Sequence, residues 1–158
     1  TDKVIQLRDK TGFPGMKVLQ FAFDPEGDSI ELPHNHTNNV VAYTGTHDNH
    51  TIKGWYEEEM GPEARDFLDL YSNRKPDESV NQAMLRLLFS SVAFMAIATM
   101  QDLLELGNEA RMNLPNTVGG NWIWRMTKDQ LTPQVEETLL DLTTTYRRTN
   151  KKLVEKKH

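Results

Sequence analysis

The 158-residue sequence contains no cysteine, and this absence removes several kinds of protein from consideration. A chain without cysteine has no disulfide framework, no thiolate nucleophile, no zinc–thiolate site and no iron–sulfur cluster. It also lacks a basic excess, since 18 basic side chains stand against 23 acidic ones and the net charge is −5. Nucleic-acid-binding surfaces are normally basic, so we expect no nucleic-acid partner.

Long hydrophobic runs are missing as well. The longest nearly apolar stretch, residues 92–100, is about half the length of a membrane span. The first residues, Thr-Asp-Lys-Val, show no basic-then-apolar signal pattern and do not begin with Met. We therefore expect a cytoplasmic chain without a membrane partner, and a gene product longer than this sequence.

The spacing of apolar residues predicts helices that alternate with strands. Helices are expected over 2–10, over 51–71 with a break at Gly61-Pro62, from a cap at Ser79, over 103–106 and over 132–150. Strands are expected over 16–23, 40–44 and 94–100, the last as a buried strand. Strands separated by helices indicate a parallel sheet with crossover connections.

Three strands cannot close a barrel, and a complete (β/α)8 barrel typically needs about 250 residues. The chain therefore looks like part of a larger unit. We divide it into one partial α/β domain over residues 1–150 and a basic tail over residues 151–158.

The densest group of reactive side chains is His47-Asp48-Asn49-His50, directly after the predicted strand 40–44. Functional groups at the carboxyl ends of parallel strands are the rule for open α/β sheets and barrels. An equally simple interpretation is that Asp48 or Asn49 caps the next helix. A metal site with His34 and His36 is a third possibility, although the spacing matches no His-Glu-x-x-His pattern.

Other chemistries find little support in the sequence. There is no Gly-x-Ser-x-Gly elbow, and Gly119-Gly120 lacks the Lys-Ser/Thr of a phosphate-binding loop. Trp122 and Trp124 follow an Asn-rich stretch, where alternating tryptophans either pack in a core or interface or stack on the apolar face of a sugar. Composition does not decide between these alternatives.

Several motifs carry a resemblance to a known family. They are Gly12-Phe-Pro-Gly-Met-Lys-Val-Leu-Gln-Phe-Ala-Phe23, Leu32-Pro-His-Asn35, Tyr43-Thr-Gly-Thr-His-Asp-Asn49, Gly54-Trp55, Gln101-Asp-Leu-Leu-Glu-Leu-Gly-Asn-Glu-Ala-Arg-Met-Asn-Leu-Pro115 and Gly120-Asn-Trp-Ile-Trp-Arg125. In this order they resemble the 4-α-glucanotransferases, also called amylomaltases or disproportionating enzymes, of glycoside hydrolase family 77. The resemblance extends over nearly the whole chain.

The resemblance implies a fold. The catalytic domain of the family is a (β/α)8 TIM barrel of the α-amylase type, and this α/β chain looks like its C-terminal part. The predicted strands 16–23, 40–44 and 94–100 would then be about the sixth to the eighth, with the remainder of the barrel expected upstream.

The resemblance also implies roles for individual residues. The family uses a nucleophilic Asp, an acid/base Glu and a third Asp that stabilises the transition state, and only the third has a counterpart here, Asp48. His47 would contact the same sugar, Phe21 would stack on an acceptor sugar, and Asn113 and Trp122 would border the groove for the substrate, an α-1,4-glucan or maltooligosaccharide. Because the other two carboxylates are missing, we expect the chain to be inactive by itself.

One position departs from the family pattern, since His50 stands where an acidic residue is usual. This puts in doubt the hydrogen bonding that orients the loop. No cofactor and no metal are expected from the resemblance. Two other hypotheses about the function remain: the chain is a glucan-binding remnant without catalysis, or it is a metal-binding protein that uses the histidine clusters.

Overall fold

Three short strands form the sheet around which the chain is arranged in the computed structural model, which describes residues 2–149. The strands are β1 (Gly15–Val18), β2 (Val40–Tyr43) and β3 (Met95–Ile97), in the order β1-β2-β3. Both pairings are parallel, with Val18 opposite Tyr43 and Tyr43 opposite Ile97. The predicted parallel sheet is confirmed. Helices form the crossover from β2 to β3, whereas among the described residues the connection from β1 to β2 contains only two 3-10 turns, Leu19–Phe21 and Pro33–Asn35.

The first strand is shorter than the sequence predicts. β1 ends at Val18, and residues Leu19–Phe21 form a 3-10 turn in place of the strand expected through residue 23. Leu19, Ala22 and Phe23 are all buried, and their spacing of i, i+3 and i+4 is that of a helical turn rather than a strand. The core therefore determines where this strand ends.

The helices are α1 (Asp2–Thr11), α2 (Ile52–Gly54), α3 (Pro62–Ser72), α4 (Val80–Ser90), α5 (Met100–Leu103) and α6 (Pro133–Thr145). The predicted break at Gly61-Pro62 is confirmed, with Gly61 at the N-cap of α3. Ser79 caps α4 as predicted, because its hydroxyl accepts a hydrogen bond from the Gln82 N–H at 3.1 Å in a full capping box.

Two predicted helices have different bounds. The short helix expected over 103–106 is α5, which begins at Met100 because the Thr99 hydroxyl accepts a hydrogen bond from the Asp102 N–H at 3.2 Å. The last helix starts near the predicted residue 132 but ends at Thr145, and Arg147 has a left-handed φ of 56°.

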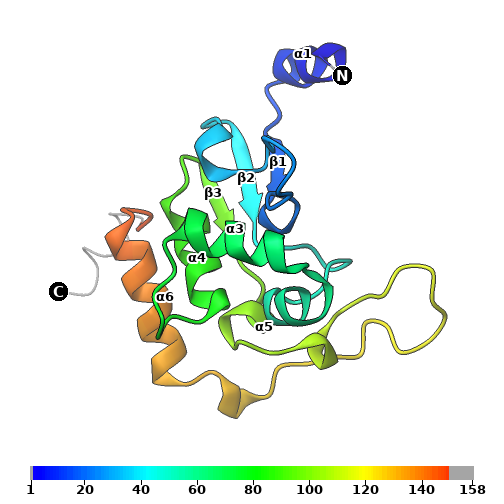
Figure 1. Ribbon diagram of the computed structural model, residues 1–158, viewed down its shortest axis with the longest axis vertical. Coiled ribbons are helices and arrows are strands. Elements are labelled where there is room, and N and C mark those ends of the chain that lie inside the picture. Colours follow the sequence, from blue (N-terminus) through cyan, green and yellow to red (C-terminus); the bar gives the residue numbers. More distant parts are fainter. Residues whose placement is uncertain (1, 150–158) are drawn as a thin grey trace.

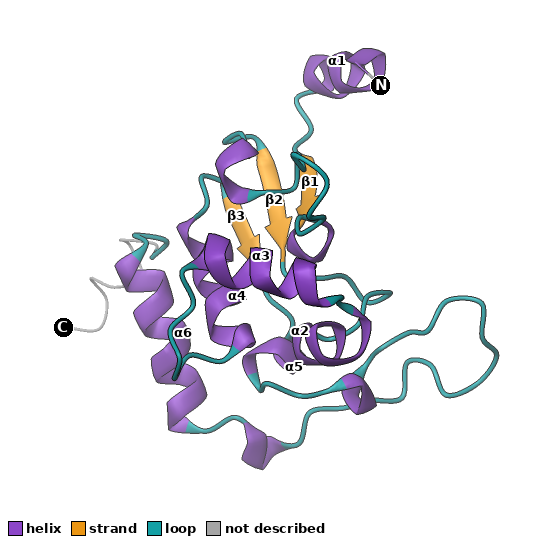
Figure 2. Ribbon diagram, viewed as in Figure 1, coloured by secondary structure: helices purple, strands orange, loops and turns teal. Residues whose placement is uncertain are grey.

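One face of the sheet carries most of the helical cover. Figures 1 and 2 show α3 and α4 lying across the strands with α6 beside α4, whereas α1 stands apart from the rest of the chain. The core between sheet and helices includes Leu19, Val40, Ala42, Ile52, Met84 and Leu88. Burying each of the larger aliphatic side chains contributes about 1.5–3 kcal/mol.

The expectation that residues 94–100 form a buried strand is wrong for this chain. Met95 is 45% exposed and Ile97 is 37% exposed, and Met16 on β1 is 54% exposed. β1 and β3 are the two edges of the sheet, so within the described residues each pairs on one side only. Unpaired edges and open apolar faces of this kind usually require a covering partner.

Among the described residues, no helix has the length and apolar character needed to cross a membrane. The basic tail over residues 151–158 lies outside the described part of the chain.

Candidate functional site

The candidate site lies at the carboxyl ends of the strands. In Figure 2 the arrowheads of all three strands point to the end of the sheet where α2, α5 and two long loops gather. The first loop, residues 44–51, follows β2. The second, residues 104–132, follows α5 and contains two 3-10 turns, Asn108–Ala110 and Lys128–Gln130.

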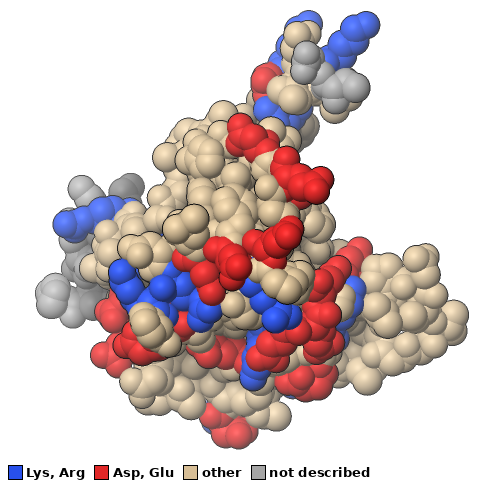
Figure 3. All heavy atoms as spheres, viewed as in Figure 1, with Lys and Arg blue, Asp and Glu red and all other residues tan. Residues whose placement is uncertain are grey.

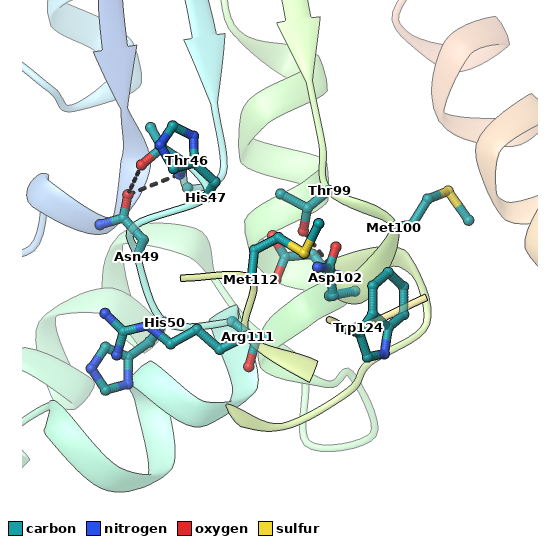
Figure 4. Close-up of a pocket in the computed structure, with 13 residues that line it drawn as sticks. Thr46, His47, Asn49, His50, Thr99, Met100, Asp102, Arg111, Met112 and Trp124 are labelled. Atoms are coloured by element: carbon teal, nitrogen blue, oxygen red, sulfur yellow. Dashed lines mark hydrogen bonds between the residues drawn. The ribbon is translucent and has the colours of Figure 1, made fainter. Parts of the chain in front are cut away.

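Hydrogen bonds within the first loop define its shape. The Asn49 side-chain oxygen accepts hydrogen bonds from both the backbone N–H and the hydroxyl of Thr46 at 2.8 Å (Figure 4). The cap of α2 is Thr51, whose hydroxyl accepts a hydrogen bond from the Gly54 N–H at 3.1 Å. The interpretation of Asp48 or Asn49 as the helix cap is therefore wrong, and the carboxylate of Asp48 is available for another role.

The Asp48 carboxylate is half exposed and is held by the second loop. Its Oδ1 accepts a hydrogen bond from the Asn113 side-chain amide at 2.6 Å and lies 3.4 Å from His47 Nε2. The Asn113 N–H donates to the His47 carbonyl at 3.1 Å. Among residues 2–149 no hydrogen bond reaches the second oxygen, Oδ2, so one carboxylate oxygen is fixed and the other is open to a ligand.

His47 lies against Trp122, with ring centroids 4.9 Å apart and planes inclined at 42°. Trp122 has a left-handed φ of 63°, and its N–H donates to the Met112 carbonyl at 2.7 Å. A left-handed backbone is costly for a bulky side chain and is concentrated at functional sites. The indole, 49% exposed, is held here by backbone geometry and not by burial in a core.

Phe21 is the predicted site residue that the structure does not bring into this group. It lies on the 3-10 turn after β1 and is 60% exposed. The neighbouring Gln20 reaches the first loop, since its side-chain amide donates to the His50 carbonyl at 2.8 Å. Phe21 thus lies at the end of the adjacent strand, while His47, Asp48, Asn113 and Trp122 gather together.

The histidines do not form a shared metal site in the part of the chain that the structure describes. His34 Nδ1 lies 2.9 Å from the Tyr71 hydroxyl, and His36 Nε2 lies 2.8 Å from the Glu31 carbonyl. No three potential metal-ligating side chains of the described residues come together. Burial is the main cause that lowers the pKa of His36, so its neutral form is favoured.

His50, the position that departs from the family pattern, is well anchored. Its Nδ1 lies 2.9 Å from the Asn108 side-chain amide nitrogen, and its Nε2 lies 3.4 Å from a carboxylate oxygen of Glu59. The imidazole therefore supplies contacts between the first loop and neighbouring segments.

Asp102, a buried residue beneath the site, was not predicted from the sequence as a site residue. Its carboxylate accepts hydrogen bonds from the Thr44 hydroxyl at 2.6 Å and from the Ile52 N–H at 2.8 Å, so it connects the two ends of the first loop. Burial raises the pKa of the Asp102 carboxyl, and the hydrogen bonds from Ile52, Thr44 and Thr99 act in the opposite direction. An acidic residue two positions after the apolar run 94–100 was the signal available.

The second loop is low in charge over its middle part. A cavity of about 250 Å³ lies beside the Asp48 group and is lined in part by His47, Asp102, Arg111 and Trp124 (Figure 4). Asp48, Asn113 and Trp122 are not among its lining residues. Residues 112–124 contain no charged side chain. Figure 3 accordingly shows the protruding loop almost free of Lys, Arg, Asp and Glu, whereas charges gather over α3. Aromatic and amide side chains without charge suit a neutral, hydroxyl-rich ligand.

A parallel sheet with polar groups at the carboxyl ends of its strands is typical of the α/β class, which includes open sheets and (β/α)8 barrels. The family described as 4-alpha-glucanotransferase, glycoside hydrolase family 77, matches residues 1–132. The chain belongs to this family, and its fold is that of part of a (β/α)8 barrel, as the resemblance implied.

Individual relatives agree with this assignment. The chain is 64% identical over 157 residues to a protein from Streptococcus pneumoniae named 4-alpha-glucanotransferase. The aligned region covers 99% of this chain and 31% of that protein. A Thermus thermophilus protein of the same name is 46% identical over 140 residues, which cover 85% of this chain and 28% of that protein. The chain spans less than a third of the length of these relatives.

A solved structure extends the comparison to three dimensions. Amylomaltase from Streptococcus agalactiae, determined in complex with acarbose, is similar with a TM-score of 0.91 and 45% identity over 95% of this chain and 30% of that structure.

Proposed function

We propose that this chain is a catalytic part of a 4-α-glucanotransferase, an enzyme that transfers α-1,4-glucan segments to the 4-hydroxyl of an acceptor glucose or glucan. The observation that carries the proposal is the half-exposed Asp48 carboxylate, held on one oxygen by Asn113 at the carboxyl end of a parallel strand. The proposal includes the cytoplasmic location and the maltodextrin or starch substrates expected from the sequence.

The reaction proceeds with retention through a glycosyl-enzyme. A carboxylate attacks the anomeric carbon while a carboxylic acid protonates the leaving glucan, and the transition state resembles an oxocarbenium ion. The hydroxyl of a second sugar then takes the glycosyl unit in place of water. The nucleophile and the acid/base have no counterpart in this chain, so we assign them to the rest of the barrel. Residues 1–150 and that remainder would together form one catalytic domain.

Asp48 acts without transferring a proton. Its free oxygen accepts hydrogen bonds from the 2- and 3-hydroxyls of the distorted sugar, and these bonds strengthen as positive charge develops on the ring. Because Asn113 already holds the other oxygen, the carboxylate needs little reorganisation during the reaction. An interaction that is stronger in the transition state than in the ground state raises kcat.

The remaining site residues shape the groove. His47 donates to or accepts from a hydroxyl of the same sugar, and the half-exposed Trp122 supports the imidazole and offers an aromatic face at the border of the groove. Phe21, exposed at the end of the neighbouring strand, stacks on an acceptor sugar. The uncharged segment 112–124 suits an uncharged substrate rich in hydroxyls.

A chimera tests the proposed function. This chain would replace the matching 157 residues of the Streptococcus pneumoniae relative, to which it is 64% identical. We expect the chimera to release glucose from maltotriose and to build longer maltooligosaccharides, as followed by a coupled glucose assay and chromatography. A chimera that melts cooperatively near the parent temperature but transfers no glucan would contradict the proposal and would favour a glucan-binding piece without catalysis.

A further inference from the structure

One guanidinium group connects the two loops of the candidate site. Arg111 Nη2 donates to the Asp48 carbonyl at 2.6 Å, and Arg111 Nε donates to the Asn113 carbonyl at 2.9 Å. The side chains of Asp48 and Asn113 are themselves hydrogen-bonded at 2.6 Å. Arg111 therefore holds the backbone of both members of the pair whose side chains meet in the site.

This arrangement spans two segments that are far apart in the sequence, 63 residues for the contact between Arg111 and Asp48. Arginine suits the position because its planar fork presents several donors at fixed angles, whereas the lysine ammonium is a compact point charge. Arg111 is partly buried, and among residues 2–149 its Nε and Nη2 donate to carbonyl oxygens and not to a carboxylate. Its contribution is thus to geometry more than to the charge of the site.

We infer that Arg111 is a positioning residue that fixes Asp48 in the orientation needed for transition-state stabilisation, an inference that rests on the proposed function. It acts through the loop backbone and does not touch the sugar. Without Arg111, His47 and Asp48 keep their contacts with the second loop through Asn113 and Trp122 alone, and the carboxylate moves by a fraction of an ångström to an ångström. A misplacement of that size can cost about 10²-fold in rate.

The test uses steady-state kinetics of the chimera on maltotriose. Arg111→Met keeps the aliphatic stem and removes the donors, and we expect kcat to fall about 10- to 100-fold with KM little changed. Arg111→Lys keeps the positive charge and can reach one carbonyl, so it should recover part of the lost kcat. Arg65→Met is the matched control, since Arg65 donates to the Glu57 carbonyl at 2.8 Å outside the site and its loss should leave kcat unchanged.

A double substitution separates positioning from a general effect on folding. If Arg111 acts through the Asp48 carboxylate, Arg111→Met should lower kcat much less in the Asp48→Asn background than in the parent. Equal losses in both backgrounds would overturn the inference, and so would a normal kcat for Arg111→Met. If Arg111→Met melts far below the parent, its kcat does not report on positioning, and the folded Arg111→Lys variant is used in its place. A kcat of Arg111→Lys equal to that of the parent then overturns the inference.

The outcomes for the two proposals are distinguishable. An active chimera that is impaired by Asp48→Asn supports the proposed function whatever the Arg111 variants do, and unimpaired Arg111 variants then overturn this inference alone. A folded but inactive chimera overturns the proposed function, and with it the inference.

Discussion

Asp48→Asn in the chimera is expected to lower kcat about 10²- to 10³-fold, with KM much less affected and the melting temperature little changed. The substitution keeps the size and shape of the side chain and replaces a charged acceptor with a neutral one. Charge-assisted hydrogen bonds are roughly twice as strong as neutral ones, and preorganised partners of this kind contribute about 3–4 kcal/mol to the transition state. The measurement is steady-state kinetics on maltotriose together with a thermal melt of the same variant.

Stability provides the control for this prediction. Thr51, and not Asp48, caps α2, so removing the Asp48 charge takes no cap away. A true cap behaves differently: Ser79→Ala, in the capping box of α4, should cost about 1 kcal/mol of stability and leave kcat near the parent value. Near-normal turnover of Asp48→Asn, or an activity that is lost only in step with the melting temperature, would contradict the assigned role.

The isolated 158-residue chain is expected to release no glucose from maltotriose above the uncatalysed background. Enzymes lower activation barriers by about 8–23 kcal/mol in total, and one stabilising carboxylate supplies only about 3–4 kcal/mol of this. Under the proposed function the nucleophile and the proton donor belong to the rest of the barrel, so we expect neither half of the retaining reaction to begin in this chain alone. Glucose released by the purified chain and abolished by Asp48→Ala would show that this expectation is wrong.

Local signals predicted the boundaries of several elements well. The cap at Ser79 and the break at Gly61-Pro62 depend on neighbouring residues, and both appear in the structure. The end of β1 did not follow from the strand pattern, because burial of Leu19, Ala22 and Phe23 against the helices requires a turn. The exposure of Met95 and Ile97 also escaped prediction, since it depends on which strand lies beside β3 and not on the apolar run itself.

The candidate site was also predictable only as far as local signals reach. The position of His47 and Asp48 after a strand, and the resemblance to a family, indicated a group that the structure does assemble with Asn113 and Trp122. The contacts that Asp102 and Arg111 make in the site do not follow from local patterns, although an acidic residue close after the apolar run 94–100 was a signal for Asp102. Their partners lie far away along the chain, 58 residues for Thr44 and Asp102, so only the folded arrangement reveals them.

The contact between Asp48 and a sugar is the central claim, and a crystal structure of the chimera with bound acarbose tests it most directly. Acarbose is the ligand in the similar Streptococcus agalactiae structure. We expect a ring of the inhibitor to lie between the two loops, with the free Asp48 oxygen about 2.5–3.0 Å from two neighbouring ring hydroxyls and with Asn113 still holding the other oxygen. Acarbose bound elsewhere, or an Asp48 carboxylate turned away from every hydroxyl of the inhibitor, would contradict the account.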